Sequence, residues 1–135
     1  MDLEIIKIAS NTENNKILKH HTHSSKMKNS ICGDEMEISI VVKDKKITDF
    51  GYQCKSCIYC QASVSALSIN SINQSVKSIK DLLLSTEKFF TNSKKKFPKN
   101  FSIFNKLFNK KNIARKECLL LPFKTLSKAL KDYDK

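Results

Sequence analysis

Apolar and polar residues alternate in the second quarter of the chain, and this pattern predicts a β-hairpin. Residues 37–43 read as a half-buried strand whose apolar side chains share one face: Ile38, Ile40 and Val42. A polar turn at 44–46 follows, and residues 47–53 form a second strand with its aromatic residues on one face. Because such strands run antiparallel, the residues before the first and after the second return to one edge of the sheet.

Other stretches have apolar residues at the three- and four-residue spacing of amphipathic helices. A short helix is expected within residues 3–9, and a long one over 57–84 with a break near 73–78. The lysine-rich residues 91–112 predict an amphipathic helix that covers the sheet or the long helix. The second interpretation is that this helix docks an acidic partner. Its apolar positions are Phe97, Phe101, Phe104, Leu107 and Phe108. A closing helix is predicted from Phe123, Leu126 and Leu130.

The chain has 135 residues, enough for a single domain with its own core. We expect an N-terminal helix and polar lead-in over residues 1–29 and the core over residues 30–135. The acidic first residues and the short apolar runs indicate neither a secretory signal nor a membrane span, so we expect a cytoplasmic protein with no membrane contact. Five cysteines in a reducing compartment favour metal binding or sulfur chemistry over disulfides.

The formal net charge of +12 raises the question of nucleic-acid binding. Arg115 is the only arginine, and the lysines are spread along the chain. Guanidinium is the group that grips phosphates and base edges in a bidentate way, so the composition predicts a solvated lysine surface and no nucleic-acid partner. With two glycines in all, the chain lacks a phosphate-binding glycine loop, which excludes nucleotide hydrolysis.

Three cysteines recur at a spacing of three at the end of the hairpin: Cys54, Cys57 and Cys60. Ser56 is a suitable N-cap for the following helix and would place Cys57 in its first turn, where unpaired N–H groups favour a thiolate. Cys60 would lie one turn later on the same face. The hairpin also returns the tripeptide Cys32-Gly33-Asp34 to this edge, so we expect two groups of ligands to converge.

With Cys118, these residues supply three thiolates and one carboxylate, enough for a tetrahedral zinc ion or the iron atoms of a small cluster: Cys32, Asp34, Cys57 and Cys118. Oxygen holds these metals more weakly than sulfur does, so the mixed set indicates a site that exchanges its load. A second metal site, made of histidines, is suggested by His20, His21 and His23. Their polar segment lacks a nearby carboxylate or thiol, and we interpret it as an exposed loop.

The order and spacing of four short motifs resemble the iron–sulfur cluster assembly scaffold family of the IscU, SufU and NifU N-terminal type. The motifs are Cys32-Gly33-Asp34, Cys57 followed by Gln61-Ala62-Ser63-Val64-Ser65, Ala114-Arg115 leading to Cys118, and Leu120-Leu121-Pro122-Phe123. The resemblance extends from about Ser30 to Leu130. It implies an α+β fold in which a small antiparallel sheet of about three strands, built on the hairpin, packs against four to five helices.

The resemblance also implies the function: accepting persulfide sulfur from a cysteine desulfurase, assembling a [2Fe–2S] or [4Fe–4S] cluster and passing it to apo iron–sulfur proteins. Such a protein is a scaffold rather than an enzyme, and it would act as a monomer or a weak homodimer. By position, Cys118 matches the family's persulfide acceptor. The family's cluster ligands match Cys32, Cys57 and Cys118, and its aspartate matches Asp34.

The chain departs from the family pattern at several positions. Glu117 stands where IscU-type members have a histidine and SufU-type members a lysine, and the proline-rich chaperone-recognition segment is absent. Cys54 and Cys60 occupy positions where small residues are common. They could be extra ligands, sulfur relays or ordinary half-buried thiols, and we favour the last interpretation. Arg115 is an accessory candidate, because a nearby cation would help the thiolate chemistry.

Three other functions fit parts of the pattern. A zinc-dependent sulfurtransferase of the SufU type would use the same residues, with Cys118 as persulfide carrier and the desulfurase as the partner it activates. An electron carrier is suggested by the C-x-x-C-x-x-C spacing, but the fourth cysteine and the proline of bacterial ferredoxins are absent. A structural zinc protein that binds RNA is the weakest interpretation, since aromatic residues are not interleaved with the bases.

Overall fold

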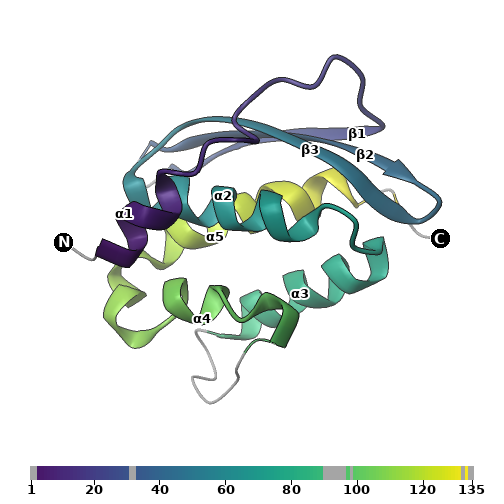
Figure 1. Ribbon diagram of the computed structural model, residues 1–135. Coiled ribbons are helices and arrows are strands. Elements are labelled where there is room, and N and C mark those ends of the chain that lie inside the picture. Colours follow the sequence, from purple (N-terminus) through teal and green to yellow (C-terminus); the bar gives the residue numbers. More distant parts are fainter. Residues whose placement is uncertain (1–2, 31–32, 90–96, 98, 132, 134–135) are drawn as a thin grey trace.

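The computed structural model describes residues 3–30, 33–89, 97, 99–131 and 133. A three-stranded antiparallel sheet lies over a group of helices that all cover one of its faces (Figure 1). The elements follow in the order α1 (Leu3–Ala9), β1 (His23–Lys28), β2 (Glu35–Lys43), β3 (Lys46–Lys55), α2 (Ile58–Ser71), α3 (Val76–Phe89), η1 (Lys99–Phe101), α4 (Phe104–Leu107), η2 (Lys110–Arg115) and α5 (Lys116–Ala129). This α+β arrangement confirms the expected fold class. Among the described helices, none has the length and apolar character needed to cross a membrane.

The predicted hairpin is present as β2 and β3, which pair from Glu35 with Lys55 down to a tight turn. The apolar face of β2 is buried against the helices at Met36, Ile38 and Ile40. Asp44 and Lys45 form the turn with φ angles of 52° and 66°. Two positive φ angles define a type I′ turn, whose twist matches that of the flanking strands.

The first strand, β1, was not predicted by the polar and apolar pattern, because its residues are almost all polar. Alternate side chains are half-buried and the others are exposed. The strand is held by backbone pairing with β2 and by α5, where the Ser25 hydroxyl donates a hydrogen bond to the carbonyl oxygen of Thr125. The position of β1 therefore depends on its neighbours rather than on its own hydrophobicity.

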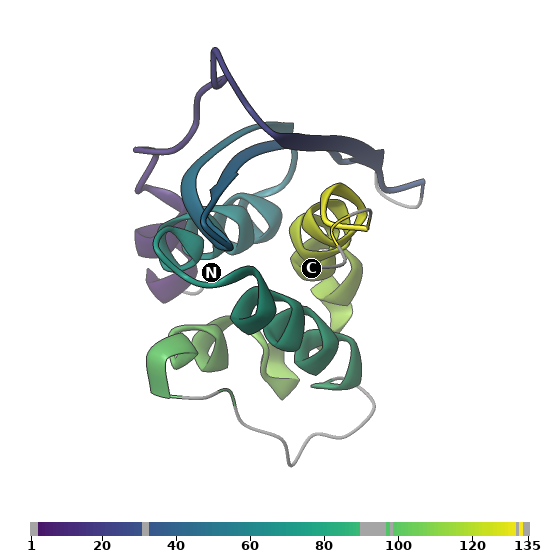
Figure 2. The ribbon, with the colours of Figure 1, turned by 90° about the vertical axis from the view of Figure 1, so that its right-hand side faces the viewer.

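Helices α2 and α5 lie side by side beneath the sheet (Figure 2). Small buried residues on α2, among them Ala62, Ser63 and Ala66, let α5 approach closely. The Ser63 hydroxyl donates a 2.6 Å hydrogen bond to the carbonyl oxygen of Leu119, which fixes the two helices along their axes. The expected break within the long helical stretch is confirmed, since α2 ends at Ser71 and α3 begins at Val76, with Asn73 at a φ of 71°.

The prediction of a single helix over residues 91–112 is wrong for the part that the structure describes. Residues 91–96 and Pro98 lie outside the described residues, and the remainder forms the short turns η1, α4 and η2. Asparagine side chains explain the difference, because Asn105 accepts from the Phe97 amide while Asn109 and Asn112 donate to backbone carbonyls. Such local bonds replace the hydrogen bonds of a continuous helix.

The aromatic residues of this segment cover the core nonetheless, as the sequence predicted. Their rings form a contact series with centroids 5.2 to 6.4 Å apart: Phe97, Phe101, Phe104, Phe108 and Phe123. All five side chains are buried. Burial of the aromatic rings, rather than helix continuity, therefore holds this segment against α5.

We predict that Lys45→Gly stabilises the protein by about 0.5–1 kcal/mol. A non-glycine residue in the left-handed region costs about 1–2 kcal/mol of stability. Replacing it by glycine recovers only part of this, because glycine has greater freedom in the unfolded chain. Urea unfolding monitored by circular dichroism measures the change. Lys46→Gly is the matched control, since the same substitution one residue later, inside β3, is expected to destabilise the protein. A loss of stability in Lys45→Gly as large as in the control would contradict the prediction.

Candidate metal and sulfur site

Asp34 is positioned by a tight loop at the start of β2. The Asn29 amide donates to the carbonyl oxygen of Asp34 and the Gly33 amide donates to the carbonyl oxygen of Asn29, both at 2.7 Å. Gly33 has a φ of +76°, a conformation that side chains rarely tolerate. The loop turns the Asp34 side chain into the protein, where it is only 7% exposed.

Cys57 lies where the chain passes from β3 into α2. It is the N-cap residue of α2, with φ −70° and ψ 168°, so the predicted assignment of Ser56 to this position is wrong by one residue. The helix ladder starts at the Cys57 carbonyl, which accepts a 3.0 Å bond from the Gln61 amide. The Cys57 thiol is half-buried at the end of the helix.

Cys118 lies in the first turn of α5, on a chain segment far from the other two residues in sequence. Arg115 is the N-cap of this helix, and the Cys118 side chain is 6% exposed. The next residue, Leu119, is bound to Ser63 of α2, so the turn that carries Cys118 is tied to the helix that follows Cys57. This hydrogen bond between α2 and α5 was not predicted from the sequence.

The structure brings these three side chains together as predicted. One ligand atom from each of Asp34, Cys57 and Cys118 lies within 4.8 Å of the others, the only such group of three found among the described residues. Ligands of a tetrahedral zinc or iron atom lie roughly 3.5–3.8 Å apart, so a small contraction would complete the arrangement. Cys32, the fourth predicted ligand, lies outside the described residues.

The carboxylate of Asp34 fits a metal-binding role. Its Oδ2 atom is buried and has no hydrogen-bond partner among the described residues. A buried carboxylate oxygen without a partner is costly, and a metal ion or iron–sulfur cluster would remove that cost. One carboxylate and two thiolates at this distance therefore suit a transition metal bound through sulfur and oxygen.

Cys54 and Cys60 adjoin the group without belonging to it. Burial raises the pKa of the Cys60 thiol, and the neighbouring charges of Asp34, Cys54 and Cys57 raise it further. Burial likewise raises the pKa of Cys54, which is half-buried. Cys60 is fully buried rather than half-buried as expected.

The other candidates take no part in the group of three. The Arg115 guanidinium lies over the ring of Tyr59, 5.3 Å from its centroid, a cation–π contact that the sequence did not reveal. Glu117 forms a 3.1 Å ion pair with Lys124. Of the histidines, His20 and His21 are exposed as expected, while His23 begins β1 instead of lying in a loop.

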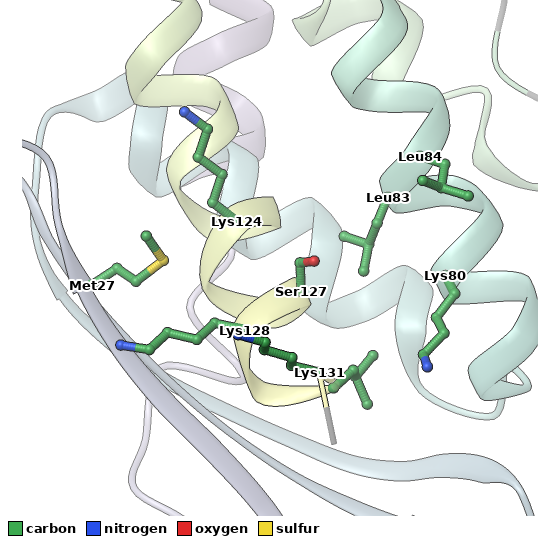
Figure 3. A pocket seen from close by; sticks show the side chains of 9 residues that line it. Met27, Lys80, Leu83, Leu84, Lys124, Ser127, Lys128 and Lys131 are labelled. Atoms are coloured by element: carbon green, nitrogen blue, oxygen red, sulfur yellow. The ribbon is translucent and has the colours of Figure 1, made fainter. Parts of the chain in front are cut away.

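A cavity of about 470 Å³ lies between β1, α3 and α5. Figure 3 shows apolar side chains such as Met27 and Leu83 at its wall and lysines around it, among them Lys80 and Lys128. No cysteine or carboxylate is among its described lining residues. The cavity is therefore separate from the group formed by Asp34, Cys57 and Cys118.

Comparison with known sequences supports the expected family. The profile of the NifU-like N terminal domain matches residues 3–135. The iron–sulfur cluster assembly scaffold protein IscU of Thermotoga maritima is 32% identical over 106 residues, which cover 77% of this chain and 73% of that protein. An uncharacterized protein of Borreliella burgdorferi is 28% identical over 120 residues, covering 89% and 83% of the two chains.

Solved structures show the same fold. The N-terminal part of a NifU-like protein from Brucella abortus superposes with a TM-score of 0.87 at 20% identity, covering 96% of this chain and 91% of that one. The SufU protein of Fervidobacterium islandicum superposes with a TM-score of 0.85 at 25% identity, covering 96% of both chains. The chain therefore belongs to the NifU-like N-terminal domain family of iron–sulfur cluster assembly scaffolds.

Proposed function

We propose that this protein accepts sulfur as a persulfide on Cys118, combines it with iron at the adjoining ligands and transfers the resulting cluster to apo-proteins. Cys57 and Asp34 are the described ligands beside Cys118, and Cys32 is the fourth. The sulfur donor would be a cysteine desulfurase, and the cluster is cargo that the protein holds only until transfer. The site would work in the cytoplasm on a monomer or a weak homodimer.

The observation that carries this proposal is the meeting of Asp34, Cys57 and Cys118 within 4.8 Å. A site that must release its cargo benefits from one ligand that is easily replaced. Asp34 meets this need, because a carboxylate oxygen binds iron less firmly than a thiolate does when both compete for a sulfur-rich centre. Its unpartnered Oδ2 atom also leaves an acceptor free for iron.

The direct test is iron and acid-labile sulfide content, with an absorbance spectrum, on the full chain purified without oxygen and then offered iron, cysteine and a cysteine desulfurase. The proposal predicts a labile chromophore with matched iron and sulfide that moves to an apo-ferredoxin. Stoichiometric zinc, no chromophore and a desulfurase that turns over faster with the chain present would instead establish the zinc-dependent sulfurtransferase.

We predict that Cys118→Ser removes the persulfide from the protein, because a serine hydroxyl cannot carry sulfane sulfur. Mass spectrometry of the alkylated chain after exposure to a desulfurase and cysteine shows the added sulfur atom and its position. Cys54→Ser is the matched control and should accept sulfur on Cys118 as the wild-type chain does. Persulfide found at undiminished yield on the Cys118→Ser chain would assign the acceptor role to another cysteine.

We predict that Asp34→Ala lengthens the lifetime of a bound cluster several-fold, because the most easily exchanged ligand is lost. Decay of the visible absorbance after addition of an apo-ferredoxin measures the lifetime. Asp49→Ala is a suitable control, since Asp49 lies on β3 outside the group of three ligands and binds its neighbour's amide. Faster decay in Asp34→Ala than in wild type would count against a transfer-competent scaffold.

A further inference from the structure

Cys57 and Cys60 form a pair at the start of α2 that the proposed function leaves partly unused. Cys57 is the N-cap residue and Cys60 follows three residues later, in the first turn of the helix. The first thiol is half-buried beside Cys118 and Asp34, and the second is completely buried. One reachable and one enclosed thiol in a C-x-x-C sequence at a helix start is the arrangement of a dithiol redox pair.

The backbone permits a disulfide between them. Helical residues three apart have Cβ atoms about 5–6 Å apart. A disulfide needs Cβ atoms about 4 Å apart, so a shift of 1–2 Å would suffice. Cys57 is the N-cap residue and has extended angles, φ −70° and ψ 168°, so its side chain can shift while its carbonyl keeps the first hydrogen bond of α2, from the Gln61 amide. Cys54 is less free, because it is paired with Met36 within the sheet.

We propose that Cys57 and Cys60 form a dithiol–disulfide pair that reduces persulfide sulfur at this site to sulfide. The proposal rests on the proposed function, in which sulfur arrives on Cys118. Cluster sulfur is sulfide, whereas the outer sulfur of a persulfide is at the oxidation level of elemental sulfur. Each sulfur atom therefore needs two electrons, and two thiols that become a disulfide supply two.

The reaction has two exchange steps. The Cys57 thiolate attacks the outer sulfur of the Cys118 persulfide, so that the Cys57 persulfide forms and Cys118 leaves as a thiolate. Cys60 then attacks the inner sulfur of the Cys57 persulfide as its proton passes to the outer sulfur, because the thiolate is the attacking form. The Cys57–Cys60 bond forms, the bond to the outer sulfur breaks, and that sulfur leaves as hydrogen sulfide with the proton of Cys60. An external dithiol reductant then restores both thiols.

The burial of Cys60 suits this second step. The enclosed position shields Cys60 from the incoming sulfur donor, so that it meets only a persulfide already formed on Cys57. Cys60 is also outside the group of three ligand atoms, so its oxidation uses no ligand other than Cys57. Sulfide would then be released next to Cys118 and Asp34, where iron is to bind.

The test uses the full chain, metal-free, reduced and freed of excess reductant, with one equivalent of glutathione persulfide. Trypsin separates the cysteines, since Cys57 and Cys60 share the peptide 56–77, Cys54 lies in 47–55 and Cys118 in 117–124. We expect release of one sulfide per chain and a 56–77 peptide lighter by two hydrogens. In Cys60→Ala we expect sulfide release to fall about tenfold or more, while the added sulfur atom stays on Cys57 or Cys118. Cys54→Ser should behave as wild type.

Several results would overturn the pair. Sulfide release from Cys60→Ala at the wild-type rate would do so, as would a wild-type disulfide that joins peptide 56–77 to 117–124.

Reconstitution with iron and inorganic sulfide is the folding control, and Cys60→Ala should develop the wild-type chromophore. A Cys60→Ala chain that folds, as judged by circular dichroism, but lacks the chromophore would make Cys60 a ligand instead. If no cysteine of Cys60→Ala retains sulfur, the proposal that the chain accepts persulfide sulfur is wrong. The peptide map of the wild-type chain tests the Cys57–Cys60 disulfide separately, because it needs no variant.

Discussion

The sulfur site depends on how closely α2 and α5 pack. Cys57 begins one helix and Cys118 lies in the first turn of the other, so the relative position of the helices sets the distance between the two sulfur atoms. Small buried residues on α2 allow the close approach, and the Ser63 hydroxyl bound to the Leu119 carbonyl fixes the helices along their axes. A slip of one helical turn, about 5.4 Å, would separate the thiols beyond the reach of a shared metal.

The hairpin adds the carboxylate of Asp34 to these two helices. Antiparallel pairing of β2 and β3 brings Asp34 and Cys57 to the same edge, although the whole hairpin separates them in sequence. The site is thus built from three separate chain segments, and it can form only in the folded protein. A buried carboxylate oxygen without a hydrogen-bond partner costs free energy, and the proposed binding of iron at this position would remove that cost.

Much of this arrangement could be predicted from the sequence, because its signals are local. Alternation of polar and apolar residues predicted the hairpin, and antiparallel geometry predicted that Asp34 and Cys57 meet. The place of Cys118 rested on family resemblance, since no local pattern links it to the hairpin. The resemblance implied about three strands, but the polar and apolar pattern did not locate β1, because tertiary contacts hold a polar segment there. The helix predicted over residues 91–112 failed because asparagine side chains bind the backbone at three points. Burial of Cys60 likewise depends on the packed helices.

The two roles of Cys57 exclude each other in time. In a disulfide with Cys60 the Cys57 sulfur is no longer a thiolate and cannot serve as an iron ligand. As an iron ligand it is a much weaker nucleophile toward a persulfide, because the metal withdraws electron density from the sulfur. Sulfide release therefore belongs to the site before it is loaded, and iron that binds first would hold Cys57 as a ligand and suppress oxidation by Cys60. Cys57 at the N-cap and Cys60 three residues later would thus give one short segment two functions. Cys57 would be a ligand when metal is present, and the two thiols would be a redox pair when it is absent.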